Sequence, residues 1–251
     1  MKRIFLLLII SFIVFSEADA QRWKRVRYEI LYGIGVTTAM TDLGGGDGIG
    51  SFGFKDVDFS QTRPGAYGGV RYKFKERLAG KFLISFGWIA GSDGITTEES
   101  RKNRGVSFSG PLLETSVVGE FSLIKERLGS RYTFSNIRRF KMKYINTYIF
   151  AGIGMIAFWP SNSNPGVSSN SEKGQTETYS HVAAAFPLGI GFKYGINRKL
   201  GVHLEVGGRF TTTDYLEGHS DTYSKSNDGY LTIMVGLHYK LKTARSGLPR
   251  F

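Results

Sequence analysis

Two histidines and one glutamate are the residues whose types and spacing first suggest chemistry. His203 and Glu205 stand two positions apart, and His238 follows in the next stretch of the same alternating pattern. Side chains two positions apart on a strand lie on one face, so we expect all three on a common inward face. A metal centre would need a further fixed ligand, and a hydrolase would need a serine positioned beside the imidazole. The sequence fixes neither, so we expect no catalytic residue, no metal ligand, no cofactor and no enzymatic activity.

A glycine-rich segment at residues 42–50 is the second place where chemistry could be sought. A phosphate-binding loop would end in Lys-Ser or Lys-Thr, and a dinucleotide-binding motif would be followed by a helix; the segment has neither feature. Asp47, Asp56 and Asp58 could offer oxygen ligands to calcium, but the residue pattern of an EF-hand loop is missing. We therefore interpret the segment as a solvated loop and leave calcium binding open.

Strands must position these residues, because apolar side chains alternate with small or polar ones in repeated stretches of the chain. The clearest stretch covers residues 200–210. One face would carry Leu200, Val202, Leu204, Val206 and Phe210, and the other Gly201, His203, Glu205, Gly207 and Arg209. One face suits lipid while the other carries charge, which is typical of strands in an outer-membrane β-barrel.

Eight segments follow this alternation, at residues 27–38, 64–74, 78–91, 106–124, 142–158, 182–194, 200–215 and 230–241. The fifth is apolar on both faces, so its inward face cannot be assigned from sequence. Beyond the N-terminus, no stretch offers the roughly 20 apolar residues that a membrane-spanning helix needs. The sequence therefore predicts an all-β fold, namely an eight-stranded antiparallel transmembrane β-barrel with up-and-down meander topology.

The first 20 residues have the features of a secretory signal peptide. Two basic residues precede an apolar run over residues 4–15, and small residues precede a cleavage point ahead of Gln21. The run is too short for a membrane anchor. We expect residues 1–20 to be removed and residues 21–251 to form one outer-membrane barrel domain. The chain has no cysteine, which excludes a disulfide framework and a thiol site.

Ionisable side chains occupy inward positions of the expected barrel. An eight-stranded barrel encloses a lumen just wide enough for its own side chains, and buried charges are tolerated there when they are paired. The inward positive and negative residues nearly balance, so we expect one paired polar network instead of a catalytic centre. Its expected members are Glu29, Arg71, Lys81, Glu114, Glu120, Lys193, His203, Glu205 and Arg209.

Connection length and charge distinguish the two rims of the barrel. Connections after the first, third, fifth and seventh segments are long, whereas those after the second and sixth are short. The long connections and their flanks hold thirteen Asp and Glu, while the termini and remaining connections hold twenty Lys and Arg against two glutamates. Outer-membrane barrels have long extracellular loops and short periplasmic turns. We therefore expect periplasmic termini and a basic periplasmic rim, which explains the net charge of +12 without a nucleic-acid partner.

The connection at residues 125–143 is long for a periplasmic turn and interleaves aromatic and aliphatic residues with cations. Its basic residues are Lys125, Arg127, Arg131, Arg138, Arg139, Lys141 and Lys143. One interpretation is contact with anionic lipid headgroups, and the other is docking onto an acidic periplasmic protein. We favour docking, and we treat these seven residues as the hypothetical partner site.

Several motifs in the first half of the chain resemble a known family. They are Arg27-Tyr-Glu-Ile-Leu-Tyr-Gly-Ile-Gly35, Thr41-Asp-Leu-Gly-Gly45, Lys55-Asp-Val-Asp-Phe59, Thr62-Arg-Pro64, Val70-Arg-Tyr-Lys73 and Phe86-Gly-Trp-Ile-Ala-Gly-Ser-Asp93. Over about residues 22–125 the chain resembles the PorG-like family of outer-membrane barrels in Bacteroidetes, whose namesake belongs to the type IX secretion machinery. The resemblance implies an eight-stranded barrel in contact with a periplasmic ring of lipoprotein and partner subunits. It implies no catalytic residue.

We therefore expect a non-enzymatic outer-membrane barrel that serves as an anchor or accessory component of a periplasmic assembly, with type IX secretion as the leading candidate. Its expected partners are outer-membrane lipid and periplasmic protein. Two alternatives stay open: a small-solute channel or surface adhesin acting through the long loops, and a lipid-modifying barrel enzyme using His203 or His238. Near the C-terminus, Pro249 makes residues 246–251 a poor strand, so a role of Phe251 as an assembly signal also stays open.

Overall fold

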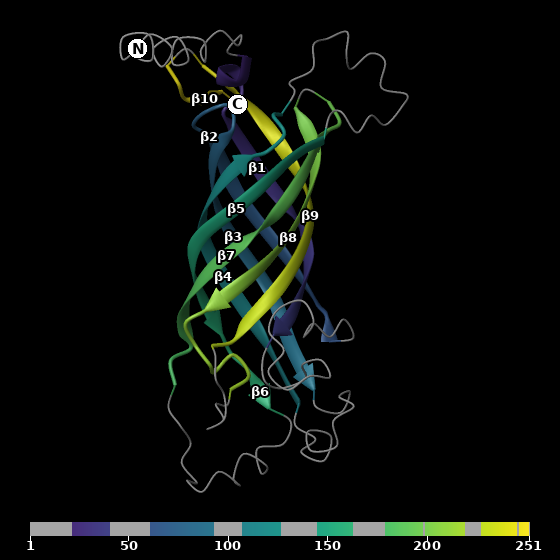
Figure 1. Ribbon diagram of the computed structural model, residues 1–251, viewed down its shortest axis with the longest axis vertical. Coiled ribbons are helices and arrows are strands. Elements are labelled where there is room, and N and C mark those ends of the chain that lie inside the picture. The colour runs from purple at the N-terminus through teal and green to yellow at the C-terminus, as the bar shows by residue number, and fades with distance from the viewer. Residues whose placement is uncertain are drawn as a thin grey trace, which may run out of the picture.

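Eight long strands dominate the computed structural model, which describes residues 22–40, 61–92, 107–126, 145–162, 179–197, 199–218, 227–244 and 246–250. The strands are β1 (Tyr28–Met40), β2 (Arg63–Lys73), β3 (Leu78–Ser92), β4 (Ser107–Ser122), β5 (Ile145–Phe158), β7 (Val182–Gly195), β8 (Leu200–Thr211) and β9 (Gly229–Thr243). The smaller elements are a 3₁₀ turn, η2 (Arg22–Arg25), and the two-residue strands β6 (Ser161–Asn162) and β10 (Pro249–Arg250). The long strands are tilted and wrap around one axis to form a cylinder (Figure 1).

The strand pairing closes this cylinder completely. Each long strand pairs antiparallel with the next one along the chain, in the order β1-β2-β3-β4-β5-β7-β8-β9. β9 then pairs antiparallel with β1, from Tyr28↔Leu241 to Met40↔Gly229. Closure of the ring leaves none of the eight long strands as an edge. The predicted all-β, eight-stranded antiparallel meander barrel is thereby confirmed.

The pleat places apolar side chains on the outside and charge on the inside. Ile34, Ile153 and Val117 on the outer face remain 59–72% exposed. In contrast, Arg71 and Glu120 on the inner face are each 2% exposed. Such a surface is unfavourable in water, because a belt of apolar side chains around the molecule would order water without burial. Contact with lipid acyl chains removes this cost, as it does for the outer surface of transmembrane barrels.

The structure assigns the pleat of the fifth predicted segment, which the sequence left open. In β5, Tyr148, Phe150 and Ile156 are buried in the interior, whereas Ile149 and Ile153 are exposed on the outer face. Two apolar positions in β9 depart from the simple alternation. Leu231 and Leu241 have outward parity but are only 4% and 8% exposed, so parity alone does not predict their environment.

The seventh predicted segment ends earlier in the structure, because β8 stops at Thr211 instead of continuing to residue 215. After Thr211 the chain leaves the direction of the strand, and two hydrogen bonds to Asp228 accompany this change. Its carbonyl accepts a hydrogen bond from the Thr211 amide at 3.1 Å, and its carboxylate accepts one from the Leu216 amide at 3.0 Å. These bonds turn the chain inward, and Leu216 becomes fully buried within the barrel.

The C-terminal segment forms a short strand that the sequence analysis regarded as unfavourable. β10 pairs with the end of β9 through Pro249↔Thr243 and Arg250↔Lys242. Proline is tolerated here because an edge position does not require its missing amide hydrogen. The expected signal peptide at residues 1–20 and Phe251 lie outside the described residues, as does the glycine-rich segment at residues 42–50.

No helix in the described part of the chain is long and apolar enough to cross a membrane.

Candidate functional site

Glu120 on β4 stands at the centre of the polar network inside the barrel. Its Oε2 atom lies 2.6 Å from Nε of Arg71 on β2 and 3.3 Å from Nζ of Lys193 on β7. Its Oε1 atom lies 3.4 Å from Nζ of Lys81 on β3. β2 and β7 stand on opposite sides of the eight-stranded ring, so one carboxylate joins opposite walls of the barrel.

Two further glutamates neutralise the remaining charge of this layer. Glu29 Oε2 lies 3.1 Å from the same arginine and 3.9 Å from the same β7 lysine. Glu205 Oε1 accepts a hydrogen bond from Lys81 at 2.6 Å and another from the hydroxyl of Tyr148 at 2.5 Å. Three carboxylates thus face three cations, which is the pairing that buried charge requires.

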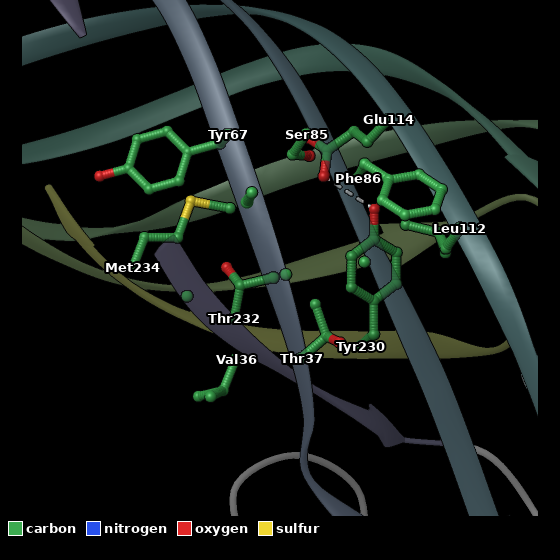
Figure 2. A pocket seen from close by; sticks show the side chains of 14 residues that line it. Val36, Thr37, Tyr67, Ser85, Phe86, Leu112, Glu114, Tyr230, Thr232 and Met234 are labelled. Carbon is green, nitrogen blue, oxygen red and sulfur yellow. Dashed lines mark hydrogen bonds between the residues drawn. The ribbon is translucent and has the colours of Figure 1, made fainter. Parts of the chain in front are cut away.

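A second ion pair lies farther along the lumen, toward the long connections. Glu114 Oε2 is 3.2 Å from Nε of Arg209 and accepts a hydrogen bond from the hydroxyl of Tyr230 at 2.8 Å. Figure 2 shows this tyrosine hydroxyl directed at the glutamate, and Thr232 and Tyr67 also line the cavity. The cavity offers about 20 Å³ to the centres of water molecules, which is room for about one water and none for a substrate.

The two histidines considered for catalysis lie in the same interior. His203 Nε2 shares a hydrogen bond of 2.7 Å with the hydroxyl of Tyr67, and its ring centre lies 5.9 Å from that of His238. Both histidines are at most 2% exposed. Among the described residues, no three His, Cys, Asp or Glu side chains come together as a metal site. The geometry therefore suits packing within the barrel wall and offers no open position for a reactant.

Apolar side chains fill the lumen on the side of the long connections. The cluster consists of Ile89, Phe108, Leu112, Ile156, Phe158, Ala185, Leu216 and Tyr230. Tyr179 and Tyr215 pack against it, with nearly parallel rings whose centres lie 5.1 Å apart. The interior thus has a charged layer and an apolar layer in series.

Glu126, just beyond β4, covers the opposite end of the lumen. Its carboxylate forms ion pairs with Lys73 of β2 and Lys240 of β9, and its side chain is 11% exposed. Burial by itself would raise the pKa of this carboxyl group. The two ammonium groups, with Arg71 nearby, outweigh that effect and hold its pKa well below the ordinary value. One glutamate therefore connects the end of β4 to β2 and, across the ring, to β9.

The structure places all nine sequence-derived network residues in the interior, each at most 4% exposed. Three interior tyrosines outside the predicted set also bond to it: Tyr67 to His203, Tyr148 to Glu205 and Tyr230 to Glu114. Lys73, Glu126 and Lys240 form a separate group of ion pairs at the end of the lumen. Lys73 and Lys240 are two of the twenty basic residues that the sequence assigns to the termini and the remaining connections. Their inward parity, shared with Arg71 and His238, was the signal that could have identified them.

Six of the seven predicted docking residues lie outside the described part of the chain, which ends at residue 126 and resumes at residue 145. The described one is Lys125. Its Nζ lies 2.8 Å from a carboxylate oxygen of Glu76 in the β2–β3 turn, and both side chains are about one-third exposed.

A closed ring of eight strands, apolar outside and filled with paired charge inside, defines an eight-stranded transmembrane β-barrel with the fold of outer-membrane barrels. The chain belongs to the family described as "Domain of unknown function (DUF6089)", whose sequence profile matches residues 5–237. No protein of curated function matches the chain significantly.

Three solved outer-membrane proteins illustrate the likeness of fold. Ail, the attachment invasion locus protein of Yersinia pestis, is 13% identical, with 86% of this chain and 99% of Ail covered and a TM-score of 0.43. OprG from Pseudomonas aeruginosa is 12% identical, with coverages of 86% and 96% and a TM-score of 0.45. Neisserial surface protein A is 8% identical, with coverages of 85% and 96% and a TM-score of 0.44.

Proposed function

We propose that this protein is a non-enzymatic outer-membrane barrel that anchors a periplasmic assembly, namely the type IX protein secretion system. The filled lumen is the observation that carries the proposal. Glu120 links Arg71 of β2 to Lys193 of β7, and Lys81 of β3 pairs with Glu205 of β8, so ion pairs cross-link opposite walls. Apolar side chains fill the lumen beyond this layer. With its interior occupied, the barrel acts through surfaces that lipid does not cover.

The two rims differ in the way expected for this orientation. The rim at which η2 and β10 lie is called here the termini rim (Figure 1), and its described residues are rich in lysine and arginine. Most acidic residues of the sequence belong to connections at the opposite rim. We infer that the termini rim faces the periplasm and that residues 125–143 leave it as the partner-binding segment. The PorG-like resemblance of residues 22–125 supports the choice of type IX secretion.

Site-specific photocrosslinking in cells from positions 131, 138 and 141 tests the proposal directly. We expect capture of a periplasmic protein, followed by its identification by mass spectrometry. Reversal of Arg138, Arg139, Lys141 and Lys143 to glutamate should weaken recovery of that protein at least tenfold, because four attractive contacts become repulsive.

The matched control reverses four basic residues of the long connections, Lys55, Arg101, Lys102 and Lys173. This control should leave partner recovery unchanged, and both variants should insert into the membrane like the wild type. Equal recovery with all three proteins would show that residues 125–143 are not the dock. Capture of a surface ligand from the long connections instead would favour an adhesin.

A further inference from the structure

Exposed cations stand around the termini rim outside the proposed partner segment. Six of them form the set called here the cation ring: Arg25, Lys75, Arg77, Lys199, Lys242 and Arg250. They come from η2, the β2–β3 turn, the β7–β8 turn, the end of β9, and β10. Within the described residues, none of the six forms an ion pair.

The described acidic residues of this rim do not neutralise the cation ring. Glu76 pairs with Lys125, and Glu126 is held between two inward lysines. The six exposed cations therefore present uncompensated positive charge, which attracts a polyanionic surface.

Exposed apolar side chains lie next to these cations in the sequence of each turn. Phe74 and Leu78 flank the two cations of the β2–β3 turn and are 58% and 41% exposed. Ile196 in the β7–β8 turn is 43% exposed, and Leu248 beside β10 is 63% exposed. Apolar side chains beside Lys and Arg are typical of the membrane interface. There the apolar side chains enter the acyl boundary, and the Lys and Arg side chains reach the lipid headgroups.

The distribution of the cations around the barrel identifies the kind of partner. The cation ring spans β1, β2, β3, β7, β8 and β9, whereas residues 125–143 connect the remaining two strands, β4 and β5. A protein docked on one side would contact only part of such a ring. A lipid leaflet surrounds the barrel and contacts all of it.

We infer that the cation ring binds the headgroups of anionic phospholipids in the leaflet at the termini rim. The ammonium and guanidinium groups of Lys75, Arg77, Lys199 and Arg250 contact lipid phosphates, while the neighbouring apolar side chains hold the rim at the acyl boundary. This binding fixes the depth of the barrel in the membrane. It is independent of the proposed partner protein, because it uses residues outside the 125–143 segment.

Native mass spectrometry of the purified, folded chain in detergent tests this inference. Phosphatidylglycerol and phosphatidylcholine with identical acyl chains are titrated in competition. We expect the wild type to retain phosphatidylglycerol preferentially. The quadruple variant K75Q/R77Q/K199Q/R250Q should lose this preference by roughly tenfold or more, since each rim cation attracts anionic lipid.

A charge-preserving variant, K75R/R77K/K199R/R250K, is the matched control and should behave like the wild type. Equal retention of the two lipids by the wild type, or an unchanged preference in the glutamine variant, would overturn the inference. The inference would also be overturned if the glutamine variant kept its lipid preference but no longer crosslinked to the periplasmic protein. That result would assign the cation ring to the protein interface. Because the lipid experiment contains no partner protein, its failure would leave the proposed docking untouched.

Discussion

At the residue scale, single buried carboxylates hold several strands of the barrel together, because each pairs with two or three cations. Glu120 holds three cations, and Glu126 joins two lysines from separate strands across the end of the lumen. A buried ion pair is weak evidence for net stability, but removal of one partner leaves an uncompensated charge. Substitution of either glutamate should therefore destabilise the folded barrel.

The Glu126→Gln variant should lose about 1–3 kcal/mol of unfolding free energy at pH 7, because two lysines lose their charged acceptor. The folded pKa of Glu126 lies well below its ordinary value, so its stabilisation is present above the ordinary carboxyl pKa and is lost as the pH falls through the folded value. The difference between wild type and variant should thus shrink in acid. Urea unfolding of the refolded wild type and variant at several pH values between 7 and 3 measures this difference in unfolding free energy.

Glu76→Gln is the matched control, since the exposed Glu76–Lys125 pair should contribute less than about 1 kcal/mol. Equal losses in the two variants, or a difference that grows in acid, would contradict the role assigned to Glu126.

At the scale of elements, glycines in β7 and β8 make room for the large side chains that fill the lumen. A Cβ atom on Gly191 would lie 2.2–2.6 Å from ring and hydroxyl atoms of Tyr148. A Cβ atom on Gly201 would lie 2.4 Å from the ring of His238. Glycine is required at these inward positions because the neighbouring strand supplies the bulk that occupies the space.

Gly191→Ala should destabilise the barrel by about 1–3 kcal/mol, because the added methyl group overpacks the site of Tyr148. Gly68→Ala is a matched control, since the closest neighbour of its Cβ would be 3.8 Å away. That change should be nearly neutral. Denaturant unfolding monitored by tryptophan fluorescence compares the two variants, and an equal effect would show that lumen packing does not set the requirement at Gly191.

At the scale of the whole molecule, two layers in series occupy the lumen. The charged layer around Glu120 occupies the half toward the termini rim, and the apolar cluster around Phe158 occupies the other half together with the Glu114–Arg209 ion pair. Eight strands leave little space beyond that taken by their own side chains. Side chains therefore fill the lumen of a barrel whose apolar outer face suits lipid.

Purified protein in liposomes should therefore release a trapped small sugar no faster than protein-free liposomes do. Light-scattering assays of solute flux give the measurement, with a wide porin as the positive control. Release well above the protein-free background would favour the channel alternative and would require the salt-bridge layer to open.

The sequence by itself determined the barrel, its strand number, its closure pattern and most of its pleat, because a period of two with one face for lipid admits few alternatives. Parity also selected nine polar residues that lie in the lumen, namely eight glutamates, lysines and arginines together with His203. It could not assign β5, where both faces are apolar, nor the early end of β8, which depends on Asp228 hydrogen bonds. Only the tertiary structure decided which charges meet. Ion pairs such as Glu120 with Lys193, or Glu126 with Lys240, cross the lumen between strands that are distant in sequence, and their partners follow from the stagger and tilt of the closed sheet.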